Sequence, residues 1–285
     1  MNTYLIRLQT LFVFLSCLQL GNAQPLNLEK PADNLAAYIK LRASLNPVEQ
    51  PVFYAKGAIY AYTPEKPWQH LFNFEMYNIA RVEKMNGDSG YRLITREMLV
   101  YEDPETDSIL TEWQNPFTKE KVTVLHVWND PVNQRFFNTS FYVPYDDNGN
   151  GRICMYNDVT LSYPSPLPKK DWPANSRSDV YQGAELFNFF CDKNRLLKKK
   201  TENIPADISW SRFSDFLPWM RMSSLPGNLL YQSRGYKMKS WNELPKKIKD
   251  FVLANHPEYA TAPTSFETPN VTSWKYFKKV MLEKK

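Results

Sequence analysis

The side chains with the greatest capacity for chemistry gather in one short segment, HVWNDPVN at residues 126–133. Histidine titrates near neutral pH, so His126 is a candidate general acid or base, and Asp130 is placed to orient it. A structural interpretation is equally open. A histidine between valine and tryptophan can be a neutral core residue, and Asn-Asp before proline sets a turn. Further ligand contacts predicted in this segment are Trp128, Asn129 and Asn133.

A second candidate site lies in residues 209–222 (SWSRFSDFLPWMRM), where two arginines are interleaved with large apolar side chains. Arg212, Trp219 and Arg221 together could hold an anionic or aromatic small molecule through charge and stacking. Two alternatives remain open. The aromatic residues could be core packing of a covering loop, and the arginines could form ion pairs with Glu97 or Asp215.

Residues 145–158 (YDDNGNGRICMYND) partly match a calcium-binding loop. Asp146, Asn148 and Asn150 fall at positions one, three and five of the EF-hand pattern, but position twelve is Asn157 instead of the bidentate glutamate. The flanking residues are typical of strands, and an Asn-Gly turn in a hairpin explains the same residues. We therefore predict no metal site here.

Motifs of known mechanism are absent from the sequence. It contains no Gly-x-Ser-x-Gly elbow, no P-loop, no dinucleotide fingerprint and no HExxH. The three histidines are far apart, and the cysteines lack zinc-ligand spacing. We predict no cofactor, and an enzyme would have to assemble its site from scattered positions.

Short runs of β-branched and aromatic residues, separated by turn signals such as Asn86-Gly87 and Asp103-Pro104, fill the first half of the chain. About seven antiparallel strands in series favour a curled sheet or a barrel-like meander, because closure removes exposed edges. The predicted strands are Val52–Tyr62, Gln69–Lys84, Tyr91–Tyr101, Ile109–Gln114, Lys121–Asn129, Phe136–Val143 and Arg152–Leu161.

Helical patterns and prolines dominate after Tyr163, and one further helix is predicted before the strands. Two long stretches with little periodicity, Ile204–Met238 and Ala254–Pro269, are expected to wrap the sheet or close its mouth. The fold class is thus β-rich α+β, with residues 24–285 as a single domain. The predicted helices are Ala32–Ser44, Asp179–Asn194, Leu244–Asn255 and Thr272–Lys284.

The first 23 residues have the pattern of a signal peptide. Arg7 precedes an apolar run, Leu8–Leu20, and Gly21-Asn22-Ala23 supplies small residues for cleavage. We predict an exported protein, secreted or periplasmic, cleaved after Ala23. The less favoured alternative is a lipoprotein anchored through Cys17.

Charge and cysteine content restrict the partners. The formal net charge of +5 falls to +4 without Arg7, and it is spread along the chain, which argues against nucleic-acid binding. No second hydrophobic stretch indicates a stable membrane span. Cys154 and Cys191 are interpreted either as one disulfide or as two buried thiols. Nothing in the sequence indicates an oligomeric state.

Several segments together resemble a family known as domain of unknown function 1838. The resemblance covers nearly the whole exported chain and so supports a single domain, but it brings no activity with it. The matching segments are NLAAY at 34–38 with Lys40 and Arg42, YEDPET at 101–106, WQNPFT at 113–118, HVWNDPVN at 126–133, SYPSPL at 162–167, WSR at 210–212, LPWM at 217–220, LPG at 225–227 and TSWKYF at 272–277.

Three functions follow as hypotheses. In the leading one the curled sheet encloses a small apolar or aromatic ligand, lined by His126, Trp128, Arg212 and Trp219. In the second, the same cavity is a cofactor-independent isomerase, lyase or hydrolase that uses His126 as acid or base with Asp130. In the third, exposed tryptophans bind a glycan or a protein.

Overall fold

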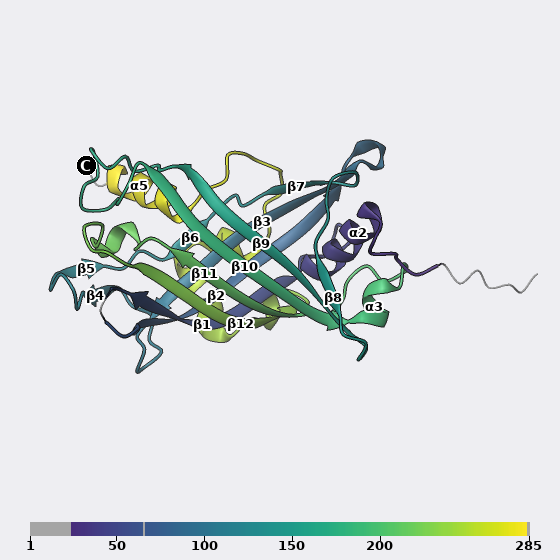
Figure 1. Cartoon of the computed structure of the whole chain (residues 1–285), viewed down its shortest axis with the longest axis horizontal. Helices are drawn as coiled ribbons and strands as arrows, with labels where there is room; N and C mark the ends of the chain where they lie inside the picture. The colour runs from purple at the N-terminus through teal and green to yellow at the C-terminus, as the bar shows by residue number, and fades with distance from the viewer. Residues whose placement is uncertain (1–23, 65, 284–285) are drawn as a thin grey trace, which may run out of the picture.

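Ten antiparallel strands form one sheet that curls around the long axis of the molecule (Figure 1). The structure is a computed structural model that describes residues 24–64 and 66–283. The strand order is β6-β3-β2-β1-β12-β11-β10-β9-β8, and β7 also pairs with β3. The strands of this sheet are β1 (Val52–Tyr62), β2 (Gln69–Lys84), β3 (Gly90–Glu102), β6 (Val127–Asn129), β7 (Gln134–Phe137), β8 (Tyr145–Asp147), β9 (Arg152–Pro164), β10 (Val180–Asp192), β11 (Asp207–Ser214) and β12 (Asn228–Met238).

The sheet is curled but not closed, because within the described ranges its first and last strands, β6 and β8, do not pair with each other. A small second sheet, β4 (Glu112–Gln114) with β5 (Lys121–Thr123), projects from one end (Figure 1). The β-rich α+β fold predicted from the sequence is therefore confirmed.

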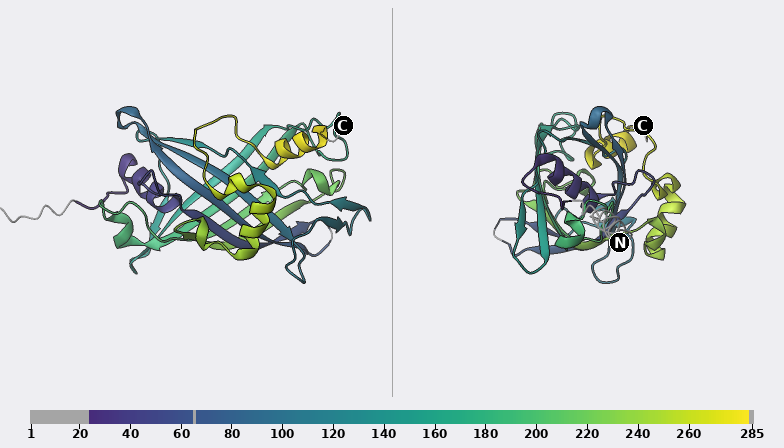
Figure 2. Two further views of the ribbon diagram at one scale, coloured as in Figure 1. Left: turned by 180° about the vertical axis from the view of Figure 1, so that it is seen from behind. Right: turned by 90° about the vertical axis from the view of Figure 1, so that its right-hand side faces the viewer.

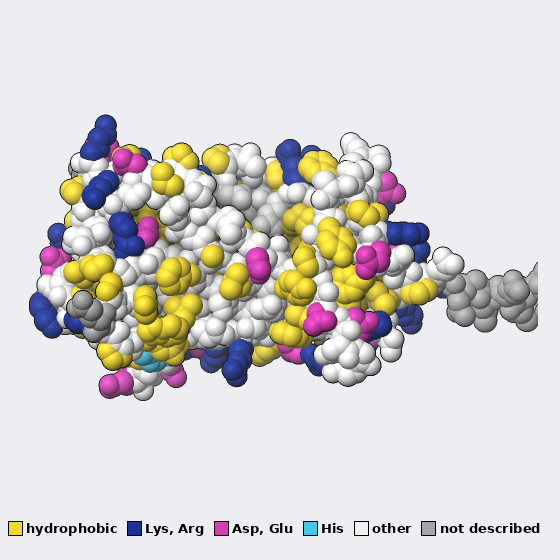
Figure 3. All heavy atoms as spheres, viewed as in Figure 1, with side chains coloured by type: hydrophobic (Ala, Val, Ile, Leu, Met, Phe, Trp, Pro, Cys, Tyr) yellow, Lys and Arg dark blue, Asp and Glu magenta, His cyan; other side chains and the backbone are white. Residues whose placement is uncertain are grey.

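Alternation along the strands separates an inner from an outer surface. On β10, Tyr181 and Phe189 are buried on the inner side, whereas Leu186 and Phe190 are exposed outside. Apolar side chains gather on this outer surface over β10–β12, as Figure 3 shows. We call Leu186, Phe190, Phe213 and Tyr236 the outer apolar patch.

Helix α2 (Pro31–Arg42) lies across one end of the curled sheet (Figures 1 and 2). Asn34 docks it. The Asn34 side chain donates to the Val143 carbonyl (2.9 Å) and accepts from the Val143 N–H (2.8 Å). Lys40, also buried, donates to the Lys198 carbonyl (2.8 Å). These contacts fix the helix so that its last turn faces the interior.

The remaining larger helices pack elsewhere on the sheet. Helix α4 (Lys246–Asn255) lies against the outer surface of β2 and β3, where Lys247 pairs with Glu75 (2.7 Å) and Glu102 (2.6 Å). Helix α5 (Ser273–Glu283) lies toward the end opposite α2 (Figure 1) and buries Trp274 and Phe277. A short helix, α3 (Lys193–Leu197), follows β10.

Two predictions about the second half of the chain are wrong. The segment 179–194, predicted as a helix, is strand β10, because its buried positions alternate with a period of two and pair with β9 and β11. The stretch 204–238, expected to wrap the outside, contains β11 and β12, which complete the wall between β10 and β1. The predicted helices at 32–44, 244–255 and 272–284 are confirmed as α2, α4 and α5, with bounds that agree within two residues over the described part of the chain.

The first-half strands were predicted with better success. β1 and β2 have the predicted bounds, and β3 and β9 agree within a few residues. The segment 121–129 is split into β5 and β6 around His126, and β4 covers only the last three residues of the segment 109–114. The predicted strand 136–143 is largely wrong, because β7 shares only Phe136 and Phe137 with it.

Cys154 and Cys191 are both free thiols. Cys154 is opposite Phe190 in the β9–β10 register and Cys191 is opposite Ile153, so consecutive positions place the two side chains on opposite surfaces of the sheet. A disulfide between them would require their side chains to point toward each other.

Across residues 24–64 and 66–283, no helix combines the length and apolar character needed to cross a membrane. The predicted signal peptide and Cys17 lie outside the described residues.

Candidate functional site

The inner surface of the curled sheet encloses a cavity of about 280 Å³. Helix α2 closes one end with Tyr38 and Arg42, and residues 270–273 cover the side where the sheet is not closed. Most of the wall is apolar. Its apolar members include Phe53, Met76, Leu93, Leu99, Val127, Val159, Leu161, Phe187, Phe189, Ile208 and Leu217.

A row of three polar side chains crosses one wall. Asn78 on β2, Glu97 on β3 and Asn129 on β6 are directly opposite one another in the strand registers. The Asn78 amide donates to Glu97 Oε1 (3.3 Å), and the Asn129 amide donates to Glu97 Oε2 (3.4 Å). Arg42 from α2 extends the row, donating through Nη2 to Asn78 Oδ1 (2.7 Å). The Glu97 carboxyl group is thus oriented from both sides by neutral amides.

A second polar group lies on the strands across the cavity. Glu185 on β10 and Arg212 on β11 are cross-strand neighbours and form an ion pair (3.0 Å). Arg212 also donates to the Tyr181 hydroxyl (2.6 Å), and Trp210 Nε1 donates to Glu185 (3.3 Å). Glu185, Trp210 and Arg212 all line the cavity.

The two cavity carboxyl groups have different electrostatic surroundings. Burial, reinforced by the negative charge of Glu185, raises the pKa of Glu97, although Arg42 and Arg212 act in the opposite direction. For Arg212, burial disfavours the charged form, but the Tyr181 hydroxyl and the negative charge of Glu185 outweigh it and raise the pKa of the guanidinium. Glu97 is thus held between neutral amides, whereas Glu185 is paired with a guanidinium group.

Three residues that border the cavity each carry a buried polar atom without a hydrogen-bond partner in the described part of the chain. These atoms are Arg42 Nη1, Asn129 Oδ1 and Arg212 Nε. Buried polar groups in folded proteins are nearly always hydrogen-bonded, so each such atom needs an explanation. A bound molecule whose polar groups hydrogen-bond to these atoms would explain all three.

His126 lies outside the cavity, between β3 and α4. Its Nδ1 accepts a hydrogen bond from the Tyr101 N–H (3.2 Å), and its ring packs edge-on against Phe251 (5.3 Å between centroids). Burial lowers the pKa of His126 to about 4, so the ring is neutral at pH 7. This geometry matches the structural interpretation of His126.

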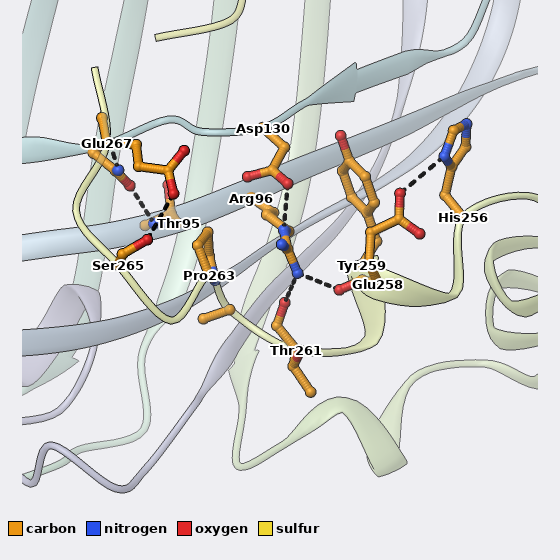
Figure 4. Close-up of polar contacts among 12 residues, drawn as sticks. Thr95, Arg96, Asp130, His256, Glu258, Tyr259, Thr261, Pro263, Ser265 and Glu267 are labelled. Carbon is orange, nitrogen blue, oxygen red and sulfur yellow. Dashed lines mark hydrogen bonds and ion pairs between the residues drawn. The ribbon is translucent and has the colours of Figure 1, made fainter. Parts of the chain in front are cut away.

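Asp130 and Trp128 also face outward. Asp130 accepts from Arg96 Nε (2.6 Å), and Arg96 further donates to the carbonyl groups of Thr261 (2.9 Å) and Glu258, as Figure 4 shows. Trp128 packs against aromatic side chains of the C-terminal region, including Tyr259 (5.0 Å). In the described residues no hydrogen bond joins Asp130 to His126, so the structure does not bring this predicted pair together.

The remaining predicted site residues are divided. Asn129 and Arg212 line the cavity as described above. Asn133 instead holds backbone groups together: it accepts from the Thr95 N–H (3.0 Å) and donates to the Glu267 carbonyl (3.0 Å). Trp219 is buried among Phe72, Tyr101 and Trp113, and Arg221 pairs with Glu120 (3.1 Å) at the surface.

Sequence reasoning did not propose Arg42, Glu97 and Glu185 as a site. The sequence could have singled out Glu97, because among the β3 residues that line the cavity it is the one with a charged side chain. Glu185 carried no signal that could be used, since its segment was interpreted as a helix. Of the arginine pairings considered, Asp215 is bonded to Arg177 (3.1 Å) instead.

The segment 145–158 forms the β8–β9 hairpin, in which Asp147 pairs with Lys193. Its flanks are strands, as the hairpin interpretation required. No group of three or more His, Cys, Asp or Glu side chains is arranged to hold a metal ion within residues 24–64 and 66–283.

The fold and the cavity define a β-rich α+β protein whose curled antiparallel sheet encloses a largely apolar cavity with polar side chains on two of its walls. The chain belongs to the family described as protein of unknown function (DUF1838), whose model matches residues 49–281, and this confirms the resemblance found in the sequence. Comparison with curated proteins gives no match.

Proposed function

We propose that this protein binds a small, largely apolar or aromatic molecule inside its curled sheet. One observation carries the proposal: a cavity of about 280 Å³ with apolar walls also borders three buried polar atoms that lack hydrogen-bond partners in the described residues. An enclosed apolar pocket with a few convergent polar groups is the usual form of a small-molecule site. The ligand contacts within this proposal are Asn129 and Arg212, joined by Arg42 and Glu97.

Native mass spectrometry of the protein purified from its own organism tests the proposal directly. We expect a discrete extra mass that is lost on denaturation. The matched control is an Ala55→Trp variant, because Ala55 lines the cavity and an indole there would fill it. An extra mass that survives in the Ala55→Trp variant, or a wild-type protein that carries no ligand and takes up no apolar probe, would contradict the proposal.

An enzyme is the second candidate, and the unlike surroundings of Glu97 and Glu185 favour it. In this alternative Glu97, instead of His126, donates and accepts the proton, because it borders the cavity and His126 does not. The reaction would be a proton transfer without cofactor, as in an isomerase or lyase. Turnover of a bound ligand that is lost in Glu97→Gln, with binding retained, separates this candidate from a carrier.

The third hypothesis, binding of a glycan or a protein through exposed tryptophans, has less support. Of the eight tryptophans in the sequence, only Trp68 is highly exposed in the described residues. Quenching of tryptophan fluorescence by polysaccharide would revive this hypothesis.

We also propose export, on the pattern of the first 23 residues. The mature protein isolated from its organism should begin at Gln24. An intact Met1, or a lipid on Cys17, would contradict cleavage after Ala23.

A further inference from the structure

Arg42 is a cation whose partners are all neutral. Its Nη2 donates to the Asn78 carbonyl oxygen (2.7 Å), and its guanidinium carbon lies 5.6 Å from the centre of the Phe53 ring. Its Nη1 is buried without a partner, and within the described residues Arg42 takes part in no ion pair. Arg212, the other cavity arginine, is neutralised by Glu185 at 3.0 Å. Burying a charge without a counter-charge is costly, so Arg42 is the unusual member of this pair.

The charge balance inside the cavity depends on Glu97. Four charged residues border it, Arg42, Glu97, Glu185 and Arg212. Glu97 contacts the amides of Asn78 and Asn129, and Arg42 reaches Glu97 only through Asn78. Burial and the charge of Glu185 favour a protonated Glu97 by raising its pKa. Within the described residues, Glu97 thus makes no direct ion pair with Arg42, and of the two cavity arginines Arg212 alone has a carboxylate in contact.

We infer that the ligand of this cavity carries an anionic oxygen group, such as a carboxylate, on an apolar body, and that Arg42 binds this group. The inference rests on the proposed function, because it concerns the same cavity. Arginine N–H groups form short, strong hydrogen bonds to anionic oxygens. One such oxygen near Nη1 would supply both the missing hydrogen bond and the missing counter-charge. The walls formed by Phe53, Phe187 and Phe189 would surround the apolar body.

Two fluorescent probes with the same aromatic body test the inference on the wild-type protein. 1-Anilinonaphthalene-8-sulfonate carries an anionic oxygen group, and N-phenyl-1-naphthylamine lacks it. We expect both to bind, and the anionic probe to bind roughly 10- to 100-fold more tightly, as charge-assisted hydrogen bonds to a buried arginine imply. The outer apolar patch could also bind such probes, so the titrations are repeated with Leu186→Ser and Phe213→Ser, which should leave the cavity signal unchanged.

Substitution of Arg42 then assigns the preference to one residue. Arg42→Met should remove the advantage of the anionic probe and leave the affinity for N-phenyl-1-naphthylamine within about threefold. Arg42→Lys, which keeps the charge, should retain part of the advantage. The matched control is Arg152→Met, because Arg152 pairs with Asp207 (3.1 Å) at the exposed surface of the same sheet. Binding of the neutral probe by each variant also reports that the cavity is intact.

The outcomes distinguish a failure of the inference about the anionic group from a failure of the proposed small-molecule binding. If the neutral probe binds and the anionic probe binds no better, the inference about the ligand falls and the proposed function stands. If the anionic preference persists in Arg42→Met but is lost in Arg152→Met, the anion is bound outside the cavity and the inference falls. If neither probe binds the wild-type protein, the proposed function falls and the inference falls with it.

Discussion

Asn78 and Glu97 face each other across the β2–β3 register, and the Asn78 amide donates to the Glu97 carboxyl group (3.3 Å) while its carbonyl accepts from Arg42 (2.7 Å). The neutral Asn78 side chain thereby separates the Glu97 carboxyl group from the Arg42 guanidinium group inside a largely apolar cavity. A direct ion pair would have cancelled the two charges, as it does for Glu185 and Arg212. The separation leaves both groups able to act on a third partner.

Glu97 should make stability depend on pH in a defined direction. Its raised pKa means that the folded protein holds the proton more tightly than the unfolded chain. The contribution of Glu97 therefore stabilises the fold fully below the ordinary glutamate pKa and is lost as pH rises through the raised value. The charged or polar groups around it are Arg42, Asn78, Asn129, Glu185 and Arg212.

The test is the free energy of unfolding in urea, measured against pH for the wild type and Glu97→Gln. The wild type should lose stability relative to the variant as pH rises, because glutamine does not ionise. Glu105→Gln, at an exposed turn, serves as the control and should follow the wild type. A difference in the free energy of unfolding between the wild type and Glu97→Gln that stays constant as pH rises would contradict the raised pKa.

His126 should also report on pH, with the opposite sign. Burial lowers its pKa to about 4, from 6.5 for a free histidine. The stability that depends on the neutral ring is present above pH 6.5 and is lost as pH falls toward 4. Integrated over this window, the loss is about 3 kcal/mol.

His126→Gln should remove most of the loss of stability between pH 6.5 and pH 4, and it should leave probe binding in the cavity unchanged. Gln keeps an acceptor for the Tyr101 N–H but cannot take up the proton. Urea unfolding at pH 7 and pH 4.5 measures the change in the free energy of unfolding, and a titration with N-phenyl-1-naphthylamine measures the affinity of the cavity for the probe. Loss of probe binding in a folded His126→Gln protein would return His126 to the site.

The sequence predicted the strands correctly where runs of β-branched and aromatic residues are separated by clear turn signals. β1 and β2 were predicted with their actual bounds, because both are rich in Val, Ile, Tyr and Phe and lie between strong turn signals. β10 was predicted as a helix, because Phe189-Phe190 and Leu186 also fit a period near 3.6. Long-range pairing with β9 and β11 decides between the two, and a local pattern does not contain that information.

The same reasoning limits what the sequence could say about the site. β6 places Val127 and Asn129 on one face and Trp128 on the other, but the sequence of a strand does not say which face borders the cavity. The chemistry-rich face, with His126 and Trp128, packs against α4 and its neighbours, whereas the cavity receives Val127 and Asn129. Arg42, Glu97 and Glu185 come from three elements, and only the curl of the sheet brings them together.

Lys247 should be the residue that attaches α4 to the sheet. It bridges two carboxyl groups that are almost fully buried, Glu75 (2.7 Å) and Glu102 (2.6 Å). Lys247→Met would leave both without this partner, and removing one member of a buried ion pair usually costs 3–5 kcal/mol. Because water still reaches the Lys247 ammonium, we expect a smaller loss of about 2 kcal/mol.

Thermal or urea unfolding of Lys247→Met measures this loss. The neighbouring Lys246 offers a matched control, since it pairs with Asp250 on the exposed side of the same helix. Lys246→Met should change the free energy of unfolding by less than about 0.5 kcal/mol. Equal effects of the two substitutions would show that the buried carboxylates do not depend on Lys247.

The last prediction concerns the segment that covers the open side of the sheet. Asn270 lines the cavity, its Oδ1 accepts from the Asn133 N–H (2.8 Å), and its amide donates to the Asn133 carbonyl (3.0 Å). This reciprocal pair fastens residues 270–273 to the chain that follows β6. Asn270→Ala removes both bonds, while the Val271 N–H still donates to the Pro131 carbonyl (2.9 Å). The segment should therefore stay in place but open more often.

We expect opening of this segment to connect the cavity with solvent between the unpaired edges of the sheet. In Asn270→Ala, association and dissociation of N-phenyl-1-naphthylamine should both accelerate, by roughly fivefold for about 1 kcal/mol of lost hydrogen bonding, with Kd nearly unchanged. Stopped-flow fluorescence measures both rates. Ser265→Ala, which removes an exposed hydroxyl bonded to Glu267 (2.6 Å) in the loop that precedes this segment, is the control and should leave both rates unchanged. If Asn270→Ala also leaves them unchanged, the ligand enters by another route, and the end closed by α2 becomes the place to look.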